Sequence, residues 1–335
     1  MGNVPPVAQS SLSMEEVWLI YRGDLDEVEA QIRKNLDSEI PLINEIAAHI
    51  LSSGGKRIRP LLLVLCSRLF GYVRQQDFML GSLIEFIHTA TLLHDDVLDE
   101  AELRRGQDTA RRIWGNHASI LVGDYLYSRA MCQISAFHNH GVNEVLSEAC
   151  KKMAEGEILQ LCAAAQPSVT ETDYLRVIEY KTGALVAASC KVGAIVGGAT
   201  ELQQAALYRF GMKMGMAFQL ADDHLDYTAD GERLGKTLGQ DFRQGMITLP
   251  LIHLLQACAY EERTQILRQI ESHELDEAAL FHLIGLMEQY GSLAYTASRA
   301  QEYIEAAIQE LDTYEDSPAK RALTTVADYM VNRDQ

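Results

Sequence analysis

Proline is absent from three long stretches of this chain, residues 61–166, 168–249 and 251–316. Those stretches are rich in Ala, Leu, Glu, Gln and Met, residue types that favour helix. Proline ends or kinks helices because it lacks a backbone N–H and its ring clashes with the preceding turn. The pattern therefore predicts an all-α fold of roughly eight to twelve helices, with no clear sign of a strand.

Length alone would allow two domains, because 335 residues exceed the usual size of a single hydrophobic core. The continuous helical pattern favours one large domain instead. Residues 1–13 are rich in Pro and Ser and show no periodicity, so we expect a flexible N-terminal tail there. Residues 14–335 are expected to form the single domain.

The charge and the cysteines exclude several classes of protein. The net charge is -18 and no block of basic residues stands out, so a nucleic-acid partner is not expected. No apolar run reaches the ~18 residues of a membrane span, and the N-terminus lacks a signal-peptide plan, so no stable membrane insertion is expected. Six Cys lie in helix-like sequence without C-x-x-C spacing, which is typical of reduced core cysteines in a cytoplasmic protein.

An acidic cluster follows an apolar helical segment at Asp95-Asp96-Val-Leu-Asp99. Asp95 and Asp99 are one helical turn apart and share a face, whereas Asp96 lies about 100° round the axis. Like charges at this spacing destabilise a helix unless a cation lies between them. Mg²⁺ suits such a site because it takes one or two carboxylates and fills its other positions with water and phosphate oxygens. A single cluster of this kind, however, is more often a solvated helix end.

The same pattern recurs at Asp222-Asp223-His-Leu-Asp226, again after apolar helical sequence. Two such helices can face each other across a cavity and hold a diphosphate through several metal ions. The repetition therefore predicts metal–diphosphate chemistry.

Basic residues near these clusters favour the same chemistry. Lys56, Arg57 and Arg59 lie beside a predicted helix N-terminus, where free N–H groups also attract anions. Each basic pair taken singly is usually a solvated surface, but several of them in a strongly acidic chain indicate an anion site. The other basic segments are Arg104-Arg105, Lys181-Thr182 and Gly235-Lys236-Thr237.

On these motifs, roughly residues 25–335 resemble the trans-prenyl diphosphate synthases, and most closely the long-chain polyprenyl diphosphate synthases. Asp95-Asp96-x-x-Asp99 and Asp222-Asp223-x-x-Asp226 match the family's two aspartate-rich motifs. The resemblance implies a helical bundle of the isoprenoid synthase type around a deep central cavity. It also implies a homodimer and about three Mg²⁺ ions per active site.

The resemblance also implies roles for individual residues. The metal ligands would be Asp95, Asp99, Asp222 and Asp226. Isopentenyl diphosphate would be held by Lys56, Arg59, His88 and Arg105. The allylic diphosphate would be held by Arg104, Lys181 and Lys236. The catalytic group beside the reacting carbons would be Lys181, Thr182 and Gln219.

The chain departs from the family pattern at two positions. Many relatives have Asp where Gln240 stands and Lys where Met246 stands. The second change removes one cation from the expected grip on the allylic diphosphate, but it leaves the reaction class unchanged.

The reaction implied is ionisation of an allylic diphosphate, condensation with isopentenyl diphosphate and loss of a proton, repeated to give an all-trans polyprenyl diphosphate. Thr91 and Ile87 precede the first aspartates by about one and two turns (~5.4 Å each) on the same helix face, with Ala90 beside them. Short-chain relatives carry aromatic residues at the positions of Ala90 and Thr91. Both residues are small here, which predicts a long product (C30–C50) and a tunnel floor lower down, near Met131.

Three alternatives remain open at this point. The enzyme could make a shorter product (C15–C20), or the chain could be a catalytically silent partner subunit of a heteromeric synthase. A terpene cyclase would also use Asp95 and Asp99, but its second metal site usually mixes Asn, Ser and Glu.

Overall fold

The computed structural model describes residues 12–52, 55–73, 75–164, 168–228, 238–272 and 276–332. The first helices are α1 (Met14–Ile20), α2 (Arg22–Leu36), α3 (Pro41–Ser52), α4 (Ile58–Arg68), α5 (Gln76–Leu98), α6 (Ala110–Trp114), α7 (Asn116–Ala136) and α8 (His140–Ala164). They are followed by α9 (Glu171–Ile178), the π-helix η1 (Glu179–Gly183), α10 (Ala184–Val196), α11 (Glu201–Thr228), α13 (Gln240–Arg243), α14 (Leu249–Ala257), α15 (Tyr260–Ser272), α16 (Glu277–Gln289), α17 (Ser292–Gln309) and α18 (Pro318–Val331).

The predicted all-α class is confirmed, with two differences in detail. The described ranges contain more helices than the eight to twelve expected, because short helices such as α1, α6 and α13 also form. A small hairpin also forms, in which β1 (Leu103–Arg104) pairs antiparallel with β2 (Gln107–Asp108). Its two turn residues, Arg105 and Gly106, have φ of 52° and 75°. Left-handed backbone at both positions suits a tight two-residue hairpin.

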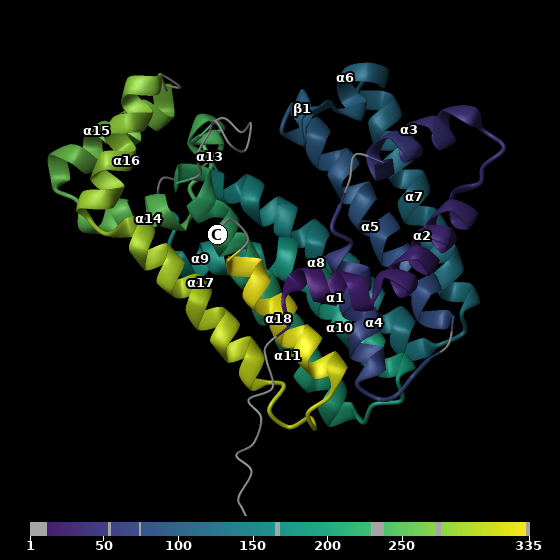
Figure 1. Cartoon of the computed structure of the whole chain (residues 1–335). Helices are drawn as coiled ribbons and strands as arrows, with labels where there is room; N and C mark the ends of the chain where they lie inside the picture. Colours follow the sequence, from purple (N-terminus) through teal and green to yellow (C-terminus); the bar gives the residue numbers. More distant parts are fainter. Residues whose placement is uncertain are drawn as a thin grey trace, which may run out of the picture.

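Helices α10 and α11 form the centre of the bundle. Helix α10 packs on α4 and α8, α11 packs on α10 and α17, and α5 packs on α2 and α7. Figure 1 shows two arms that diverge from this centre. One arm ends in α6 and the hairpin, and the other carries α13, α15 and α16.

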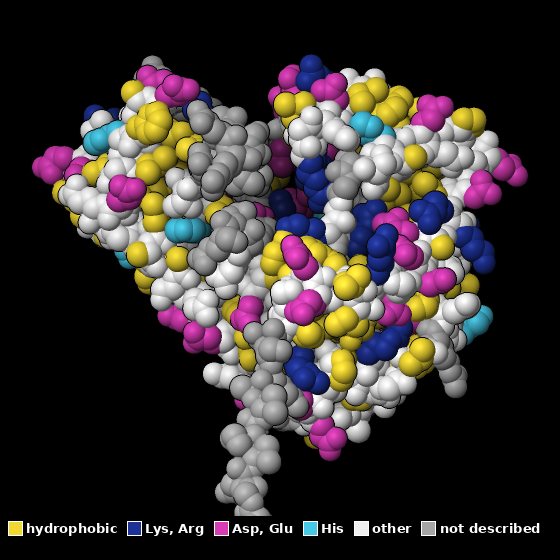
Figure 2. Space-filling model, viewed as in Figure 1, with side chains coloured by type: hydrophobic (Ala, Val, Ile, Leu, Met, Phe, Trp, Pro, Cys, Tyr) yellow, Lys and Arg dark blue, Asp and Glu magenta, His cyan; other side chains and the backbone are white. Residues whose placement is uncertain are grey.

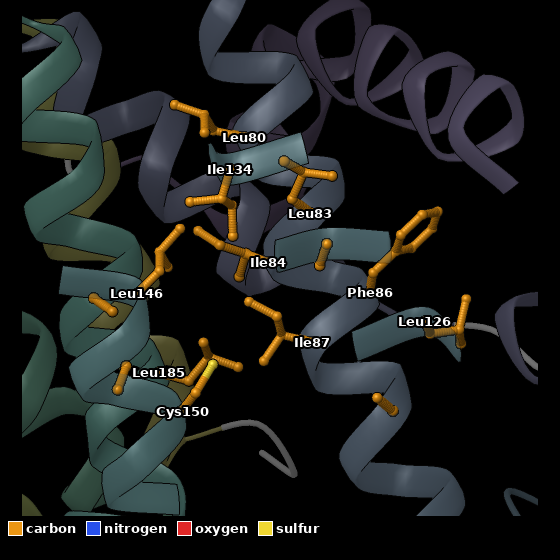
Figure 3. Close-up of a cluster of buried hydrophobic side chains, with 14 of the residues drawn as sticks. Leu80, Leu83, Ile84, Phe86, Ile87, Leu126, Ile134, Leu146, Cys150 and Leu185 are labelled. Atoms are coloured by element: carbon orange, nitrogen blue, oxygen red, sulfur yellow. The ribbon is translucent and has the colours of Figure 1, made fainter. Parts of the chain in front are cut away.

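Helix α5 is apolar nearly all round and is the main support of one arm. Its side chains pack with those of α7, α8 and α10 in one buried cluster, part of which is drawn in Figure 3. Burial on several sides fixes the axis of α5 along most of its length. The last turn, which carries Asp95 and is capped by Asp99, lies beyond this apolar cluster. The residues labelled in Figure 3 are Leu80, Leu83, Ile84, Phe86, Ile87, Leu126, Ile134, Leu146, Cys150 and Leu185.

Glycines let three helical segments approach closely around η1. A Cβ on Gly156 of α8 would lie 2.6 Å from the backbone nitrogen of Lys181. A Cβ on Gly215 of α11 would lie 2.8 Å from the Cα of Gly183. Real Cβ atoms do not come this close to backbone, so larger residues would push the helices apart. The π-helix itself widens one turn of an otherwise continuous helix, a feature common at functional sites.

Three expectations concern the ends of the chain, the membrane and the cysteines. Residues 1–11 of the predicted tail lie outside the described residues, and α1 begins at Met14 after the N-cap Ser13. Among the described helices, none combines the length and the apolar character needed to cross a bilayer. The cysteines are free thiols as predicted, but Cys132 and Cys162 are exposed and are therefore not core residues.

We expect Gly215→Ala to lower the free energy of unfolding by about 1–3 kcal/mol, because the added methyl group overpacks a backbone-to-backbone contact. Gly285→Ala in α16 is the matched control, since a Cβ there meets nothing within 4 Å. The control should be neutral or slightly stabilising, because alanine favours helix over glycine. Urea unfolding followed by circular dichroism compares the two. Equal stabilities would contradict the close approach of α11 to η1.

Candidate active site

The two acidic clusters meet at one cavity of about 680 Å³. Asp99, from the end of α5, and Asp223, from α11, both line it. Figure 2 shows the surface hollowed between the two arms, with basic and acidic side chains gathered at the bottom of the hollow. One aspartate of each motif therefore lines the same cavity, and of the four predicted metal ligands, all within the described residues, Asp99 is the one among the lining residues. Other lining residues include Leu98, Glu157, Ile158, Leu161, Tyr174, Lys181, Thr182, Gln219, Asp241 and Met246.

The first cluster is carried by the last turn of α5. The backbone N–H of Asp99 donates to the carbonyl of Asp95 at 2.8 Å, so the two residues stay one turn apart. The pKa of Asp95 is raised to about 7, mainly by burial and also by the nearby carboxylates of Glu157 and Asp99, against the opposing charge of Lys181. Asp95 is thus a carboxyl group whose charge is incompletely balanced by the protein.

The middle aspartate of this cluster does not share that environment. Asp96 is 1% exposed, and its Oδ1 accepts a hydrogen bond from Nε of Arg104 at 2.8 Å. Arg104 lies on β1, so this ion pair fixes the hairpin against the end of α5.

The second cluster involves a carboxylate that the sequence did not single out. The pKa of Asp241 is raised to about 9. Burial is the largest cause, and the negative charges of Asp223, Asp226, Asp222 and Asp99 act in the same direction. The contribution of Asp99 comes from the opposite cluster, which agrees with the shared cavity. The only sequence signal for Asp241 was its place after Gln240 in the segment compared with the family.

Asp226 has a further contact within its own arm. Its two carboxylate oxygens accept hydrogen bonds from the backbone N–H groups of Gln240, at 3.1 Å, and Asp241, at 3.0 Å. Asp226 therefore anchors the start of α13, and its role as a metal ligand stays a prediction.

The acidic residues fit a divalent cation that is shared with a substrate. Among the described residues, no three His, Cys, Asp or Glu side chains gather closely enough to enclose a metal ion alone. Mg²⁺ does not require such a cage, because it binds one or two carboxylates and takes phosphate and water oxygens for the rest. The raised pKa values of Asp95 and Asp241 mark uncompensated carboxyl groups on both sides of the cavity, as this mode of binding requires.

His88 lies on α5 about two turns before Asp95, and a group of arginines surrounds it. Burial lowers the pKa of His88 well below its ordinary value, and the positive charges of Arg59, Arg105, Arg104 and Arg57 lower it further. His88 is therefore neutral near pH 7. The Nε of Arg59 is buried and has no hydrogen-bond partner in the described part of the chain. A guanidinium N–H in this state, beside further cations, suits a bound anion.

Arg57 differs from Arg59 although the two are neighbours in sequence. Its guanidinium contacts Glu29 at 2.5 Å, Glu85 at 2.8 Å and the carbonyl of Leu51 at 2.9 Å. These bonds use the guanidinium in holding α2, α4 and α5 together. Arg57 is therefore a structural residue, although the sequence grouped it with Lys56 and Arg59 as a cation beside a helix N-terminus.

Lys56 contacts the C-terminal helix. Its Nζ lies 4.6 Å from the centre of the Tyr329 ring and donates a hydrogen bond to the Tyr329 hydroxyl. The neighbouring residue Gly55 lies beside Arg105 and Arg57, because a Cβ on Gly55 would be 3.3 Å from Nη1 of each arginine. Gly55 thus leaves room for the two guanidinium groups, whereas the predicted contact of Lys56 with a diphosphate stays a prediction.

The predicted catalytic group comes together on η1 and α11. Nζ of Lys181 lies 2.8 Å from Glu157, a residue that sequence analysis missed. Burial lowers the pKa of Lys181, but the charges of Asp95 and Glu157 outweigh this and leave it raised, so the lysine is cationic. The hydroxyl of Thr182 donates to Oε1 of Gln219 at 2.8 Å.

Two positions concern the expected grip on the allylic diphosphate. Lys236 lies outside the described residues, in the gap between 228 and 238. Met246 lines the cavity, and its sulfur accepts a hydrogen bond from Nε2 of Gln160 at 3.5 Å. A neutral thioether therefore occupies a wall position where the family pattern has a cation.

The positions linked to product length lie below the first cluster and are buried or partly buried. Ile87 and Ala90 are 0% and 2% exposed and belong to the apolar cluster of α5, α7, α8 and α10. Met131 packs against the same cluster, and the hydroxyl of Thr91 donates to the carbonyl of His88 at 2.8 Å. A tunnel along this path would therefore be lined mainly by apolar side chains, with the Thr91 hydroxyl already paired to backbone.

Comparison with known proteins gives a consistent result. The sequence profile of the family described as Polyprenyl synthetase matches residues 40–287. The chain is 42% identical to octaprenyl diphosphate synthase of Escherichia coli (strain K12), over 97% of this chain and 100% of that protein. It is 34% identical to a short chain isoprenyl diphosphate synthase of Methanothermobacter thermautotrophicus, over 96% of this chain and 100% of that protein.

Solved structures give the same picture. A decaprenyl diphosphate synthase from Rhodobacter capsulatus superposes with a TM-score of 0.92 at 41% identity, covering 96% of this chain and 99% of that one. A polyprenyl synthase from Caulobacter crescentus CB15, complexed with calcium and isoprenyl diphosphate, also has a TM-score of 0.92. Its identity is 36%, over 98% of this chain and 100% of that one.

The crowded carboxylates predict an unusual pH dependence of stability. The pKa of Asp241 is raised to about 9 in the folded protein, so the folded state holds a proton that the unfolded state loses at lower pH. Stability from this group is present at low pH and is lost as pH rises towards about 9. In metal-free buffer, Asp241→Asn should therefore gain in melting temperature relative to the wild type as pH rises from about 5 to 9. Differential scanning calorimetry measures this, with the exposed Asp312→Asn as control; parallel curves for Asp241→Asn and the wild type would contradict the crowding.

Proposed function

Because the chain belongs to the polyprenyl synthetase family, we propose that it condenses an allylic diphosphate with successive molecules of isopentenyl diphosphate. The enzyme is a prenyltransferase, and its product is an all-trans polyprenyl diphosphate. The observation that carries the proposal is the shared cavity, which Asp99, Asp223 and Lys181 line from opposite sides.

Long-chain products are favoured by the relatives. Identity is 42% to an octaprenyl and 41% to a decaprenyl diphosphate synthase, against 34% to a short-chain enzyme. The small residues Ala90 and Thr91 agree with this order.

We propose Mg²⁺ as the cation, held by Asp95 and Asp99 on one side and by Asp222 and Asp226 on the other. When bound, it would stabilise negative charge on the diphosphate. Support comes from the oxygen-only donor set, and from the related Caulobacter crescentus structure, which is described as a complex with calcium and isoprenyl diphosphate.

The basic residues divide between the two substrates. Arg104 and Lys181, with Lys236, would hold the allylic diphosphate, and their charges would stabilise the negative charge that grows as the C–O bond breaks. Arg59, Arg105 and Lys56 would hold isopentenyl diphosphate. Neutral His88 adds a hydrogen-bond donor there without further charge.

The carbon chemistry would take place beside Thr182 and Gln219. The double bond of isopentenyl diphosphate attacks the allylic cation, and we expect the departing diphosphate to accept the proton that is lost. Apolar residues in the cavity wall, such as Ile158 and Leu161, would limit access of water, which would otherwise quench the cation.

We also propose that the chain acts as a homodimer in the cytoplasm. Apolar side chains along α6 and α7 are exposed in the single chain, which supports a paired surface. They are Ile113, Ile120, Leu121 and Tyr127, with exposures of 47%, 40%, 66% and 40%. Activity of the purified chain alone would separate this reading from a silent partner subunit.

We expect Asp95→Ala and Asp222→Ala each to lower the rate of chain elongation by at least ~100-fold, because each removes charge stabilisation from the transition state. Incorporation of radiolabelled isopentenyl diphosphate onto farnesyl diphosphate measures the rate. Asp312→Ala is the control and should keep the wild-type rate, because Asp312 is an exposed carboxylate that is not among the residues lining the cavity. Near-wild-type rates for the first two variants would rule out the metal roles proposed.

Ala90→Phe should shorten the products, because the ring would close the path below the first aspartates. Mass spectrometry of the products formed from farnesyl diphosphate and isopentenyl diphosphate gives the distribution. Ala90→Ser keeps the side chain small and should leave the distribution unchanged. An identical product range for Ala90→Phe and the wild type would refute the predicted tunnel.

A further inference from the structure

We propose that Tyr174 is a positioning residue that acts through Asp223 to fix the amide of Gln219, and thereby turns the oxygen lone pairs of Thr182 towards the cavity. The inference rests on the proposed function, since it concerns the side chains beside the reacting carbons. Neither Tyr174 nor Asp223 was among the predicted site residues.

A continuous chain of hydrogen bonds links these four side chains. The Tyr174 hydroxyl donates to Oδ2 of Asp223 at 2.5 Å, and Nε2 of Gln219 donates to Oδ1 of Asp223 at 2.9 Å. The Thr182 hydroxyl then donates to Oε1 of Gln219 at 2.8 Å. The residues come from α9, α11 and η1, and all four line the cavity.

The direction of this chain follows from the chemistry of its groups. Both oxygens of Asp223 accept hydrogen bonds, one from the Tyr174 hydroxyl and the other from the NH₂ side of the Gln219 amide. The carbonyl side of that amide is then left to face Thr182. A hydroxyl has one proton, and Thr182 uses it towards Gln219. What Thr182 offers to its other neighbours is therefore its lone pairs.

Lone pairs held in this way suit the proposed reaction. A fixed dipole with its negative end towards a developing positive charge stabilises that charge without reorganising. An allylic cation beside Thr182 would be such a charge. If the Gln219 amide could turn over, its NH₂ group would face Thr182, and the threonine proton would be free to point at the cation instead.

Tyr174 is well placed to prevent that turn. It is 5% exposed, and Asp223 and Thr182 are 4% and 9% exposed, so water has little access to the network. The ring packs in an apolar cluster with residues such as Met216 and Leu220 of α11. Helix α9 is itself fixed at its start by reciprocal hydrogen bonds that form a capping box.

The first acidic motif shows a parallel arrangement. Asp96, its middle aspartate, is buried and holds Arg104, whereas Asp99 lines the cavity. In both motifs the middle carboxylate therefore orients a side chain of the proposed site. The outer carboxylates are the ones proposed above as ligands of the cations.

The test compares Tyr174→Phe with Tyr295→Phe. Tyr295 packs against the same apolar cluster and loses an equivalent bond, from its hydroxyl to Glu171 at 2.8 Å, but it is not among the residues lining the cavity. We expect Tyr174→Phe to lower kcat by about 10-fold or more, with KM for both diphosphates and the Mg²⁺ concentration for half-maximal rate nearly unchanged. Tyr295→Phe should keep the wild-type kcat, and thermal melts should show both variants folded.

A double-mutant cycle separates positioning from a general structural effect. In a Thr182→Val background the hydroxyl is gone, so Tyr174→Phe should change kcat by less than about 2-fold. The proposal is overturned if Tyr174→Phe behaves like Tyr295→Phe, or if its effect is undiminished in the Thr182→Val background. Absence of condensation by the wild-type protein would instead overturn the proposed function, and this inference with it.

Discussion

The repulsion between carboxylates on opposite sides of one cavity is the constraint on which the rest of the structure depends. Asp99 and Asp241 come from the two arms of the bundle, and the charge of Asp99 contributes to the raised pKa of Asp241. The apolar burial of α5 and the close approach of α11 to η1 at Gly215 hold the arms together against this repulsion. We propose that a site built in this way is completed by cations that arrive with an anion, which would allow a chain of net charge -18 to bind diphosphates.

The sequence predicted those features that depend on local pattern. Proline-free runs predicted the helices, and the repeated Asp-Asp-x-x-Asp spacing predicted two acidic helix segments at a common cavity. The sequence could not distinguish the structural role of Arg57 from the predicted substrate-binding role of Arg59. The difference depends on the ion pairs of Arg57 with Glu29 and Glu85, which are distant in sequence. The hairpin at Arg104-Arg105 also escaped prediction, since two left-handed residues at its turn leave little periodic signal.

Residues missed by sequence reasoning share one property, which is that their role depends on a partner brought in by the fold. Glu157 is significant because it contacts Lys181, and Asp241 because four other carboxylates surround it. Tyr174 is significant because it reaches Asp223 from a different helix. In contrast, the outer aspartates of each motif were named from the repeated motif and the family resemblance, and their role as metal ligands stays a prediction.

The most direct test of the account is whether both acidic clusters grip the same diphosphate. Isothermal titration calorimetry of inorganic pyrophosphate in the presence of Mg²⁺ measures this with the wild type, Asp95→Asn, Asp222→Asn and the double variant. A shared grip predicts that the two substitutions are strongly coupled, so that the double variant binds little more weakly than either single one. Independent, additive losses of binding free energy would mean that the clusters act on separate ligands and would contradict the account.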